Sequence, residues 1–327
     1  MRFLTNASTD PWYNLSFDEY CLEQYPSDDS FFYLWRNRPA VIVGLNQNVY
    51  AEVNLEFLDE HGICLARRST GGGAVYHDLQ NLNYSIVGRD VSPAPVVEAL
   101  RRLGVPAELS GRNDIFVDGR KVSGYARRIF RDRALIHGTL MYDVDLDTLA
   151  CVLDTPGSKL AAKGVASVRS RVANLKDYLP GFASLDALQK ALQELLSEGD
   201  GAMPFGEADQ AAVQALRDAK YATWAWNYGQ SRAASLVRRA SLPCGTVEAR
   251  LNVDRGVLTS VEFAGDFLGS LPAAGLAERL AGLRFEREAI GAALRTAPVG
   301  SYFDGTDADG LLYLLLSGAA GVPGSGL

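Results

Sequence analysis

Three consecutive glycines at residues 71–73 interrupt an apolar stretch, and this run limits what the surrounding chain can form. Segments typical of strands lie on both sides of it, at residues 63–66 and 82–87. Because glycine has no Cβ, the backbone between them can take positive φ angles and approach a ligand closely. Arg67 and Arg68 precede the run, and their guanidinium groups suit phosphate or carboxylate. The pattern is typical of either a surface turn or a loop that binds an anionic ligand.

A second informative segment is a predicted β-hairpin that turns at residues 118–119, an Asp-Gly pair between apolar runs. This turn places Lys121 on the return strand, opposite Phe116. Strict alternation along the strand places Lys121 and Ser123 on one face and Val122 on the other. Small residues follow, so a bulky ligand could lie against the strand. A strand lysine is more often a solvated edge charge, so the hairpin alone leaves both interpretations open.

Composition narrows the classes of function. The net charge of −7 argues against an extended nucleic-acid-binding surface but allows a local basic pocket. No apolar run approaches the roughly 20 residues of a membrane helix, and no signal peptide precedes the polar N-terminal residues, so we expect no membrane association. The four cysteines are widely spaced and form no CxxC motif, which predicts reduced thiols in a cytoplasmic protein.

Strands and helices follow one another through about residue 238, and we expect residues 1–238 to form the larger domain. Strands are predicted at 2–5, 31–36, 40–44, 63–66, 82–87 and 134–141, and helices at 14–25, 54–61, 92–104, 146–153, 184–196 and 207–220. Ser16 and Glu19 have the spacing of a capping box, and Asn54 is the expected N-cap of the second helix, which ends before Gly62.

The pattern changes beyond residue 238, and we expect residues 239–327 to form a small α+β domain of their own. Strands are predicted at 247–253 and 257–263, and helices at 272–282, 286–295 and 307–316. This part contains no cluster of catalytic residue types. The Gly-, Ala- and Pro-rich end, from about residue 317, is predicted to be a loose tail.

Two further segments each allow two interpretations. Residues 158–172 are rich in Lys and Arg within an acidic chain, which is typical of a solvated loop or of a flap that brings positive charge to a phosphate. His137 lies in the apolar strand 134–141, where a histidine is more often a hydrogen-bonded core residue than a catalyst.

In this order the segments resemble the lipoate-protein ligases, specifically the bacterial form with an added C-terminal domain. The resemblance covers nearly the whole chain and rests on residues 67–78 (RRSTGGGAVYHD), 81–83 (NLN), 111–114 (GRND), 121–124 (KVSG), 137–140 (HGTL), 159–164 (KLAAKG), 167–175 (SVRSRVANL) and 224–230 (WAWNYGQ). It implies a large α+β domain with a mixed sheet, related to biotin protein ligases, whose active site lies on the sheet.

The resemblance also implies an activity. ATP and Mg²⁺ would activate free lipoate to lipoyl-AMP, and the lipoyl group would then pass to a specific lysine of a carrier domain. The implied partners are the lipoyl domains of 2-oxoacid dehydrogenase E2 subunits and the H protein of the glycine cleavage system, with no nucleic acid and no membrane.

Individual roles follow only where this sequence matches the motifs. Lys121 matches the central lysine, which contacts the lipoyl carbonyl and the α-phosphate, and Asp114 matches a position near the metal. Residues matching the lipoate- and nucleotide-binding segments are Arg68, Gly71, Gly72, Gly73, Ala74, Val75, Tyr76, Gly138, Thr139, Ala162 and Lys163. Thr70 stands where serine is commoner, and both residues offer a hydroxyl.

Two alternatives remain open from the sequence. One is an ATP-independent octanoyl or lipoyl transferase, which needs an activated cysteine. Cys151 is the nearest choice, although its apolar neighbours favour a buried structural role. The other alternative is a catalytically silent lipoyl-binding module, which the retention of Lys121 and of the whole glycine motif argues against.

Overall fold

The computed structural model describes residues 1–110, 113–153, 171–231, 234–317 and 319–320. Contacts divide the chain into two units. The first unit comprises Met1–Leu45, Gly62–Ala150 and Gly164–Trp226, and the second comprises Asn46–His61, Cys151–Lys163 and Asn227–Leu327. The predicted boundary after residue 238 falls inside strand β11 (Ala234–Leu242), and the two-domain division placed there stays a prediction.

A seven-stranded mixed sheet forms the centre of the first unit. Its strand order is β1 (Arg2–Phe3), β2 (Phe31–Trp35), β6 (Asn81–Gly88), β10 (Arg133–Met141), β9 (Arg120–Phe130), β8 (Asp114–Val117) and β7 (Glu108–Ser110). Only the β1–β2 pair is parallel among these described strands. The sheet and its helices confirm the predicted α+β class, although the short β7 was not predicted.

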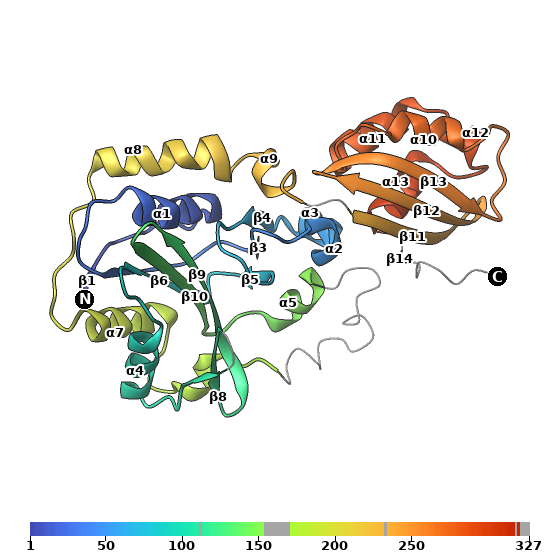
Figure 1. The fold of residues 1–327 in the computed structure, drawn as a ribbon. Helices are drawn as coiled ribbons and strands as arrows, with labels where there is room; N and C mark the ends of the chain where they lie inside the picture. The colour runs from blue at the N-terminus through green and yellow to red at the C-terminus, as the bar shows by residue number, and fades with distance from the viewer. Residues whose placement is uncertain (111–112, 154–170, 232–233, 318, 321–327) are drawn as a thin grey trace. The chain divides into compact units, whose positions relative to one another are not determined.

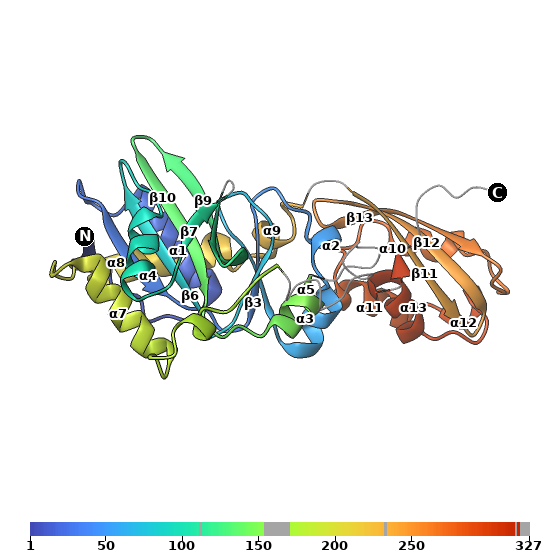
Figure 2. The same cartoon turned by 90° about the horizontal axis from the view of Figure 1, so that it is seen from below.

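Helices cover both faces of this sheet, as Figure 1 shows. On one face, α4 (Ala94–Arg102) and α7 (Leu185–Ser197) bury a core with alternate residues of β2, β6 and β10. On the other, α1 (Pro11–Glu23) packs on the sheet and α8 (Glu207–Leu216) packs on α1. Figure 2 turns the unit so that α4 and α7 face the viewer.

The start of α1 differs from the prediction. The helix begins at Pro11, and the Asp10 carboxylate caps it by accepting from the Trp12 amide at 3.2 Å. Ser16 and Glu19 therefore lie inside the helix, where no capping box can form. The neighbouring Asp10-Pro11 pair, an N-cap followed by proline at N1, is the stronger start signal.

A second, three-stranded sheet lies on the side of α1. It has the order β4 (Cys64–Arg67), β3 (Ala40–Val43) and β5 (Val75–His77). The predicted strands 31–36 and 40–44 thus enter different sheets, and β5 was missed because the glycine run breaks its pattern. Residues 68–74 connect β4 to β5 and are called the glycine loop below.

Only one glycine of the run takes a backbone conformation that requires glycine. Gly72 has φ +95°, whereas an added Cβ at Gly71 or Gly73 would meet nothing within 4 Å. The closest approach comes from outside the run. A Cβ at Gly44 would lie 2.1 Å from the Gly72 carbonyl oxygen, so the end of β3 and the glycine loop touch backbone to backbone.

The predicted hairpin is present, but a β-bulge alters which side chains share a face. Phe116 pairs with Lys121 as predicted, and Ile115 pairs with Ser123, so Val122 is the extra residue. Alternation therefore shifts by one. Lys121 lies on the face of Phe116, whereas Ser123 lies on the buried opposite face, which corrects the prediction that Lys121 and Ser123 share a face.

Other described helices of the chain are short. They are α2 (Val49–Glu52), α3 (Leu55–His61), α5 (Leu146–Val152), a 3-10 turn at Leu175–Tyr178, a π-helical turn at Arg217–Tyr221 and α9 (Trp224–Asn227). The predictions for α3 are confirmed: the Asn54 side chain accepts from the Phe57 amide at 3.2 Å, and Gly62 follows with φ +61°.

The later part of the second unit has a four-stranded sheet in the order β13 (Val257–Gly265), β12 (Gly245–Asp254), β11 (Ala234–Leu242) and β14 (Ala319–Ala320). Four helices accompany it among the described residues: α10 (Ala274–Leu280), α11 (Arg287–Thr296), α12 (Val299–Tyr302) and α13 (Ala308–Ser317). The prediction of a small α+β unit is confirmed, and β11, β14 and α12 are additions. No described helix in either unit is long and apolar enough to cross a membrane.

Gly44→Ala is expected to destabilise the first unit by about 1–3 kcal/mol, because the new methyl would overlap the Gly72 carbonyl and displace the glycine loop. Gly71→Ala is the matched control and should change stability by less than about 0.5 kcal/mol. Urea denaturation followed by tryptophan fluorescence measures both, since all four tryptophans lie in the first unit. Equal midpoints for the two variants would contradict the described contact.

Candidate active site

A cavity of about 130 Å³ lies in the first unit, between the glycine loop and the face of the large sheet that α1 covers. Leu15 of α1, Trp35 of β2, Ile42 of β3 and Val75 of β5 give it apolar walls. The remaining lining residues are Arg68, Gly72, Gly73, Ala74, His77, Asn83, Asn113, Lys121, Gly124, Tyr125, Ala126, His137, Gly138 and Thr139. Apolar walls with a few convergent polar groups are typical of a small-molecule site.

Lys121 supplies positive charge to this cavity. Its Nζ lies 2.8 Å from Asp114 Oδ1, and the two side chains are 35% and 25% exposed. The ammonium is therefore held at the cavity wall rather than released to solvent. The Lys121 amide donates to Arg171 at 2.9 Å, and its carbonyl accepts from Ala173 at 2.9 Å, so the backbone on both sides of the side chain is anchored.

Arg68 is 6% exposed, and each of its guanidinium nitrogens donates to an acceptor in the glycine loop or in β3. Nη1 donates to the Ile42 carbonyl at 3.0 Å, Nη2 to the Gly71 and Gly73 carbonyls at 2.8 Å each, and Nε to the Thr70 hydroxyl at 3.0 Å. Burial lowers the pKa of Arg68 to about 10, which leaves it charged at neutral pH. Arg68 thus shapes the glycine loop, and its contact with a nucleotide stays a prediction.

A chain of buried polar groups connects the glycine loop to α1. His137 Nδ1 donates to Asp18 Oδ2 at 2.6 Å, and Thr70, whose hydroxyl oxygen already accepts from the arginine, donates to His137 Nε2 at 2.8 Å. The hydroxyls of Tyr33 and Ser85 donate to the other Asp18 oxygen at 2.6 and 2.7 Å. The interpretation of His137 as a hydrogen-bonded core residue is confirmed, and it also lines the cavity.

The structure brings most of the predicted site residues together. Those that line the cavity are Arg68, Gly72, Gly73, Ala74, Val75, Lys121, Gly138 and Thr139. Gly71 and Tyr76 do not line it. Alternation along β5 explains Tyr76, because its neighbours Val75 and His77 face the cavity. Ala162, Lys163 and most of the basic segment 158–172 lie outside the described residues.

Several residues of the cavity, and Asp18 in the polar chain behind it, were not predicted. Asp18 is 119 positions from His137, and no local pattern in the sequence connects the two. Asn83 and His77 do lie in segments that carried the family resemblance, so their positions were available as a signal. Trp35 and Leu15 follow from the packing of β2 and α1 against the glycine loop, which needs the tertiary fold.

The described residues contain no group of three or more His, Cys, Asp or Glu side chains that could hold a metal ion. A protein-only metal cage is therefore absent from this part of the chain. Asp114 offers one carboxylate beside Lys121. This arrangement fits Mg²⁺ in its usual form, bound by one carboxylate together with substrate phosphates and water.

No cysteine is among the described residues that line the cavity. Cys151 lies in α5, and Cys21 is fully buried, with burial raising its pKa well above the ordinary value. Burial likewise raises the pKa of Cys64 to about 11. The described site thus lacks the activated thiol that a transferase needs.

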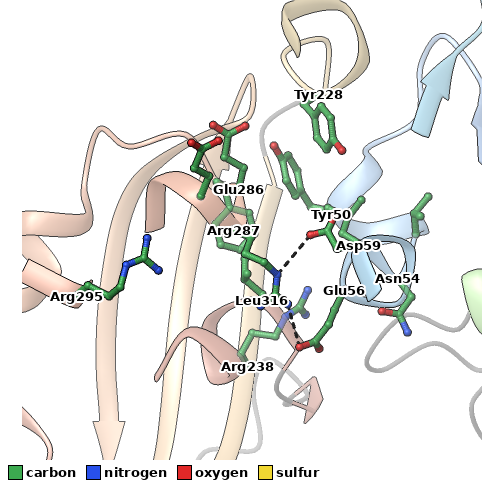
Figure 3. A pocket seen from close by; sticks show the side chains of 14 residues that line it. Tyr50, Asn54, Glu56, Asp59, Tyr228, Arg238, Glu286, Arg287, Arg295 and Leu316 are labelled. Carbon is green, nitrogen blue, oxygen red and sulfur yellow. Dashed lines mark hydrogen bonds and ion pairs between the residues drawn. The ribbon is translucent and has the colours of Figure 1, made fainter. Parts of the chain in front are cut away.

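A larger cavity of about 440 Å³ lies within the second unit (Figure 3). Arg287 contacts Glu56 at 3.2 Å and Asp59 at 3.5 Å there. Burial raises the pKa of both carboxyls, although Arg287 opposes the shift. Four carboxylates line this cavity against three arginines, so it offers no net attraction for the phosphate or carboxylate that the glycine motif predicts. We therefore assign the chemistry to the smaller cavity.

Comparison with known proteins identifies two matching families. Residues 10–197 match the lipoyl protein ligase A/B catalytic domain, and residues 231–315 match the bacterial lipoate protein ligase C-terminus. The chain is 35% identical to lipoate-protein ligase LplJ of Bacillus subtilis and 37% identical to lipoate-protein ligase 1 of Staphylococcus aureus. Each match covers 96% of this chain and 100% of the relative.

Solved structures give the same result. A bipartite lipoate protein ligase from Thermoplasma acidophilum, studied with its E2 lipoyl domain, matches with a TM-score of 0.63 and 32% identity over 71% of this chain and 97% of that one. A lipoate-protein ligase A bound with ATP matches with a TM-score of 0.60 and 31% identity over 70% and 98% of the chains. A putative T. acidophilum ligase with bound lipoic acid matches with a TM-score of 0.60 and 30% identity over 69% and 98%.

His77→Gln is expected to make the free energy of unfolding depend less steeply on pH below about pH 6.5. Burial, followed by the charge of Arg68, lowers the His77 pKa from 6.5 to about 3, so the unfolded chain binds a proton that the folded chain does not. This stabilisation is complete above about pH 6.5 and is lost as the pH falls toward 3. Between pH 6 and 4, wild-type stability should fall by up to about 1.4 kcal/mol per pH unit more than that of the variant. Urea denaturation at each pH measures the difference, and parallel profiles would contradict it.

Proposed function

The chain belongs to the lipoate-protein ligase family, and from this membership we propose that it activates free lipoate with ATP to lipoyl-AMP and then transfers the lipoyl group to a lysine of a carrier domain. The observation that supports the proposal most is the position of Lys121. Its ammonium lines the same cavity as the glycine loop and as the apolar walls suited to an acyl chain.

Adenylation requires the lipoate carboxylate to attack the α-phosphorus of ATP while negative charge grows on the phosphoryl oxygens. Bringing two anions together needs fixed positive charge and precise placement more than it needs a protein nucleophile. Lys121 has both properties, because Asp114 and the strand backbone hold it in place. The new bond joins a carboxylate oxygen to the α-phosphorus, and pyrophosphate leaves.

Asp114 is the residue that would hold Mg²⁺, which would neutralise charge on the phosphates. The glycine loop presents backbone to the ligand, and its shape depends on Arg68. We propose that Arg68 serves the nucleotide mainly through this shape, since its nitrogens already donate to Ile42, Thr70, Gly71 and Gly73.

In the second step the amine of the carrier lysine attacks the acyl carbonyl, an amide forms and AMP leaves. Lys121 would stabilise the oxygen of that carbonyl, as an oxyanion-hole donor does. We propose lipoyl domains of 2-oxoacid dehydrogenases and the glycine cleavage H protein as acceptors, because a structural relative was studied with its E2 lipoyl domain. We also propose a cytoplasmic location, which the four unpaired cysteines support.

Lys121→Ala is expected to reduce lipoylation on the order of 10²–10³-fold while the protein stays folded, because the variant lacks the charge that the reaction needs. The assay is mass spectrometry of an isolated lipoyl domain after incubation with enzyme, lipoate and MgATP. Lys190→Ala, which removes an exposed lysine from α7, is the matched control and should retain wild-type rates.

Two outcomes of this assay would contradict the proposal. Normal lipoylation by Lys121→Ala would remove the lysine from the mechanism. Transfer by the wild-type protein without ATP, from an acyl-carrier thioester, would favour the transferase alternative instead.

A further inference from the structure

One wall of the candidate site contains a buried hydrogen-bond donor that has no acceptor among the described residues. His77 is 3% exposed, and its Nε2 is without a partner. Because the atom is buried, water cannot supply the missing hydrogen bond. Buried polar atoms are nearly always paired, so an unpaired one needs an explanation.

Neighbouring asparagines determine which nitrogen of His77 carries the proton. Asn14 Nδ2 donates to Asn37 Oδ1 at 2.8 Å, which orients the Asn37 amide. Asn37 Nδ2 then donates to His77 Nδ1 at 3.0 Å. Since Nδ1 accepts, the proton of the neutral ring is on Nε2. The unpaired atom is therefore an N–H donor and needs an acceptor from outside the described chain.

The donor lies at the opposite end of the cavity from the ammonium of Lys121. A row of residues crosses the sheet: Trp35 of β2 pairs with Asn83 of β6, Asn83 pairs with Thr139 of β10, and the Thr139 hydroxyl accepts from the Gly124 amide of β9 at 3.2 Å. Lys121 Nζ lies 2.9 Å from the Cβ position of Gly124. The His77 ring lies 6.1 Å from the Trp35 ring, at the other end of the row.

These three steps between strands span roughly 14 Å, since neighbouring strands lie about 4.8 Å apart. Asn83, next to Trp35 in the row, adds a second buried nitrogen, Nδ2, with no acceptor among the described residues. An acyl chain whose carboxylate meets Lys121 would thus extend along the row and end near His77. The apolar walls suit its methylene groups, and the far end offers N–H donors.

We propose that His77, through its Nε2–H, is a specificity-determining residue that favours an acyl chain with sulfur at its far end over a plain saturated chain. This inference rests on the proposed function. The ring sulfurs of lipoate are weak acceptors and can partner the N–H. Octanoate has the same chain length but no sulfur, so its binding would leave the buried N–H without an acceptor. A site with a buried donor binds such a ligand less well, because the unpaired donor costs free energy.

The test measures kcat/KM for lipoate and for octanoate with the full chain, MgATP and a lipoyl domain. The wild-type protein is expected to prefer lipoate by roughly tenfold or more. His77→Gln keeps an N–H donor and should retain most of the preference. His77→Met has a similar volume without a donor and should lower the ratio toward one. Equal ratios in the wild type and in His77→Met would overturn the inference.

A substrate analogue tests the same contact without any substitution. The saturated acid 5-cyclopentylpentanoate has a five-membered ring but no sulfur. The wild-type protein should use it as poorly as octanoate if the N–H recognises sulfur. Use equal to that of lipoate would show that ring shape decides, and it would overturn the inference.

Failure of the proposed function is distinguishable from failure of the inference. If the carrier receives neither acid, the ligase proposal fails. Calorimetric binding of lipoate, octanoate and the cyclopentyl acid without ATP then still reports the preference. Tighter binding of lipoate by the wild type, absent in His77→Met, supports the role of His77, and equal affinities refute it.

Discussion

The shape of the site depends on Arg68, a buried cation whose guanidinium is hydrogen-bonded to the protein itself. The Arg68 guanidinium lies among the carbonyl oxygens of Ile42, Gly71 and Gly73, and it holds together the end of β3 and both sides of the glycine loop. A buried charge is costly unless its donors are satisfied, so the loop can fold in this form only with those carbonyls turned inward. The loop conformation and the burial of the arginine therefore depend on each other.

The polar chain through His137 extends this constraint to the rest of the first unit. Thr70 connects the glycine loop to His137, and Asp18 connects His137 to α1. Asp18 also accepts from Tyr33 and Ser85 on neighbouring strands. Such networks are stable only when every member is paired. The position of the glycine loop over the sheet is thus set by α1 as well as by the strands that carry the loop.

Local chemistry in the sequence was enough to predict much of this structure. The Asp-Gly turn and its pairing of Phe116 with Lys121, the Asn54 cap and the α+β character of the chain beyond residue 238 all depend on short-range patterns, and the structure confirms them. The roles of individual site residues came from the family resemblance and stay predictions. What the sequence could not show was long-range: the separation of β2 and β3 into two sheets, the pairing of Asp18 with His137, and the hydrogen bond from Arg68 to the Ile42 carbonyl.

The extra residue at Val122 bears on what determines the orientation of Lys121 in the hairpin. One inserted position reverses the alternation of the strand, so the ammonium and the buried hydroxyl two places later point to opposite sides of the sheet. Deleting that residue would leave the lysine and the serine adjacent, and adjacent residues of a regular strand also point to opposite faces, so the charge would keep its side of the sheet. The orientation of Lys121 therefore depends on its pairing with Phe116, and the bulge separates the lysine from the serine without turning either of them over.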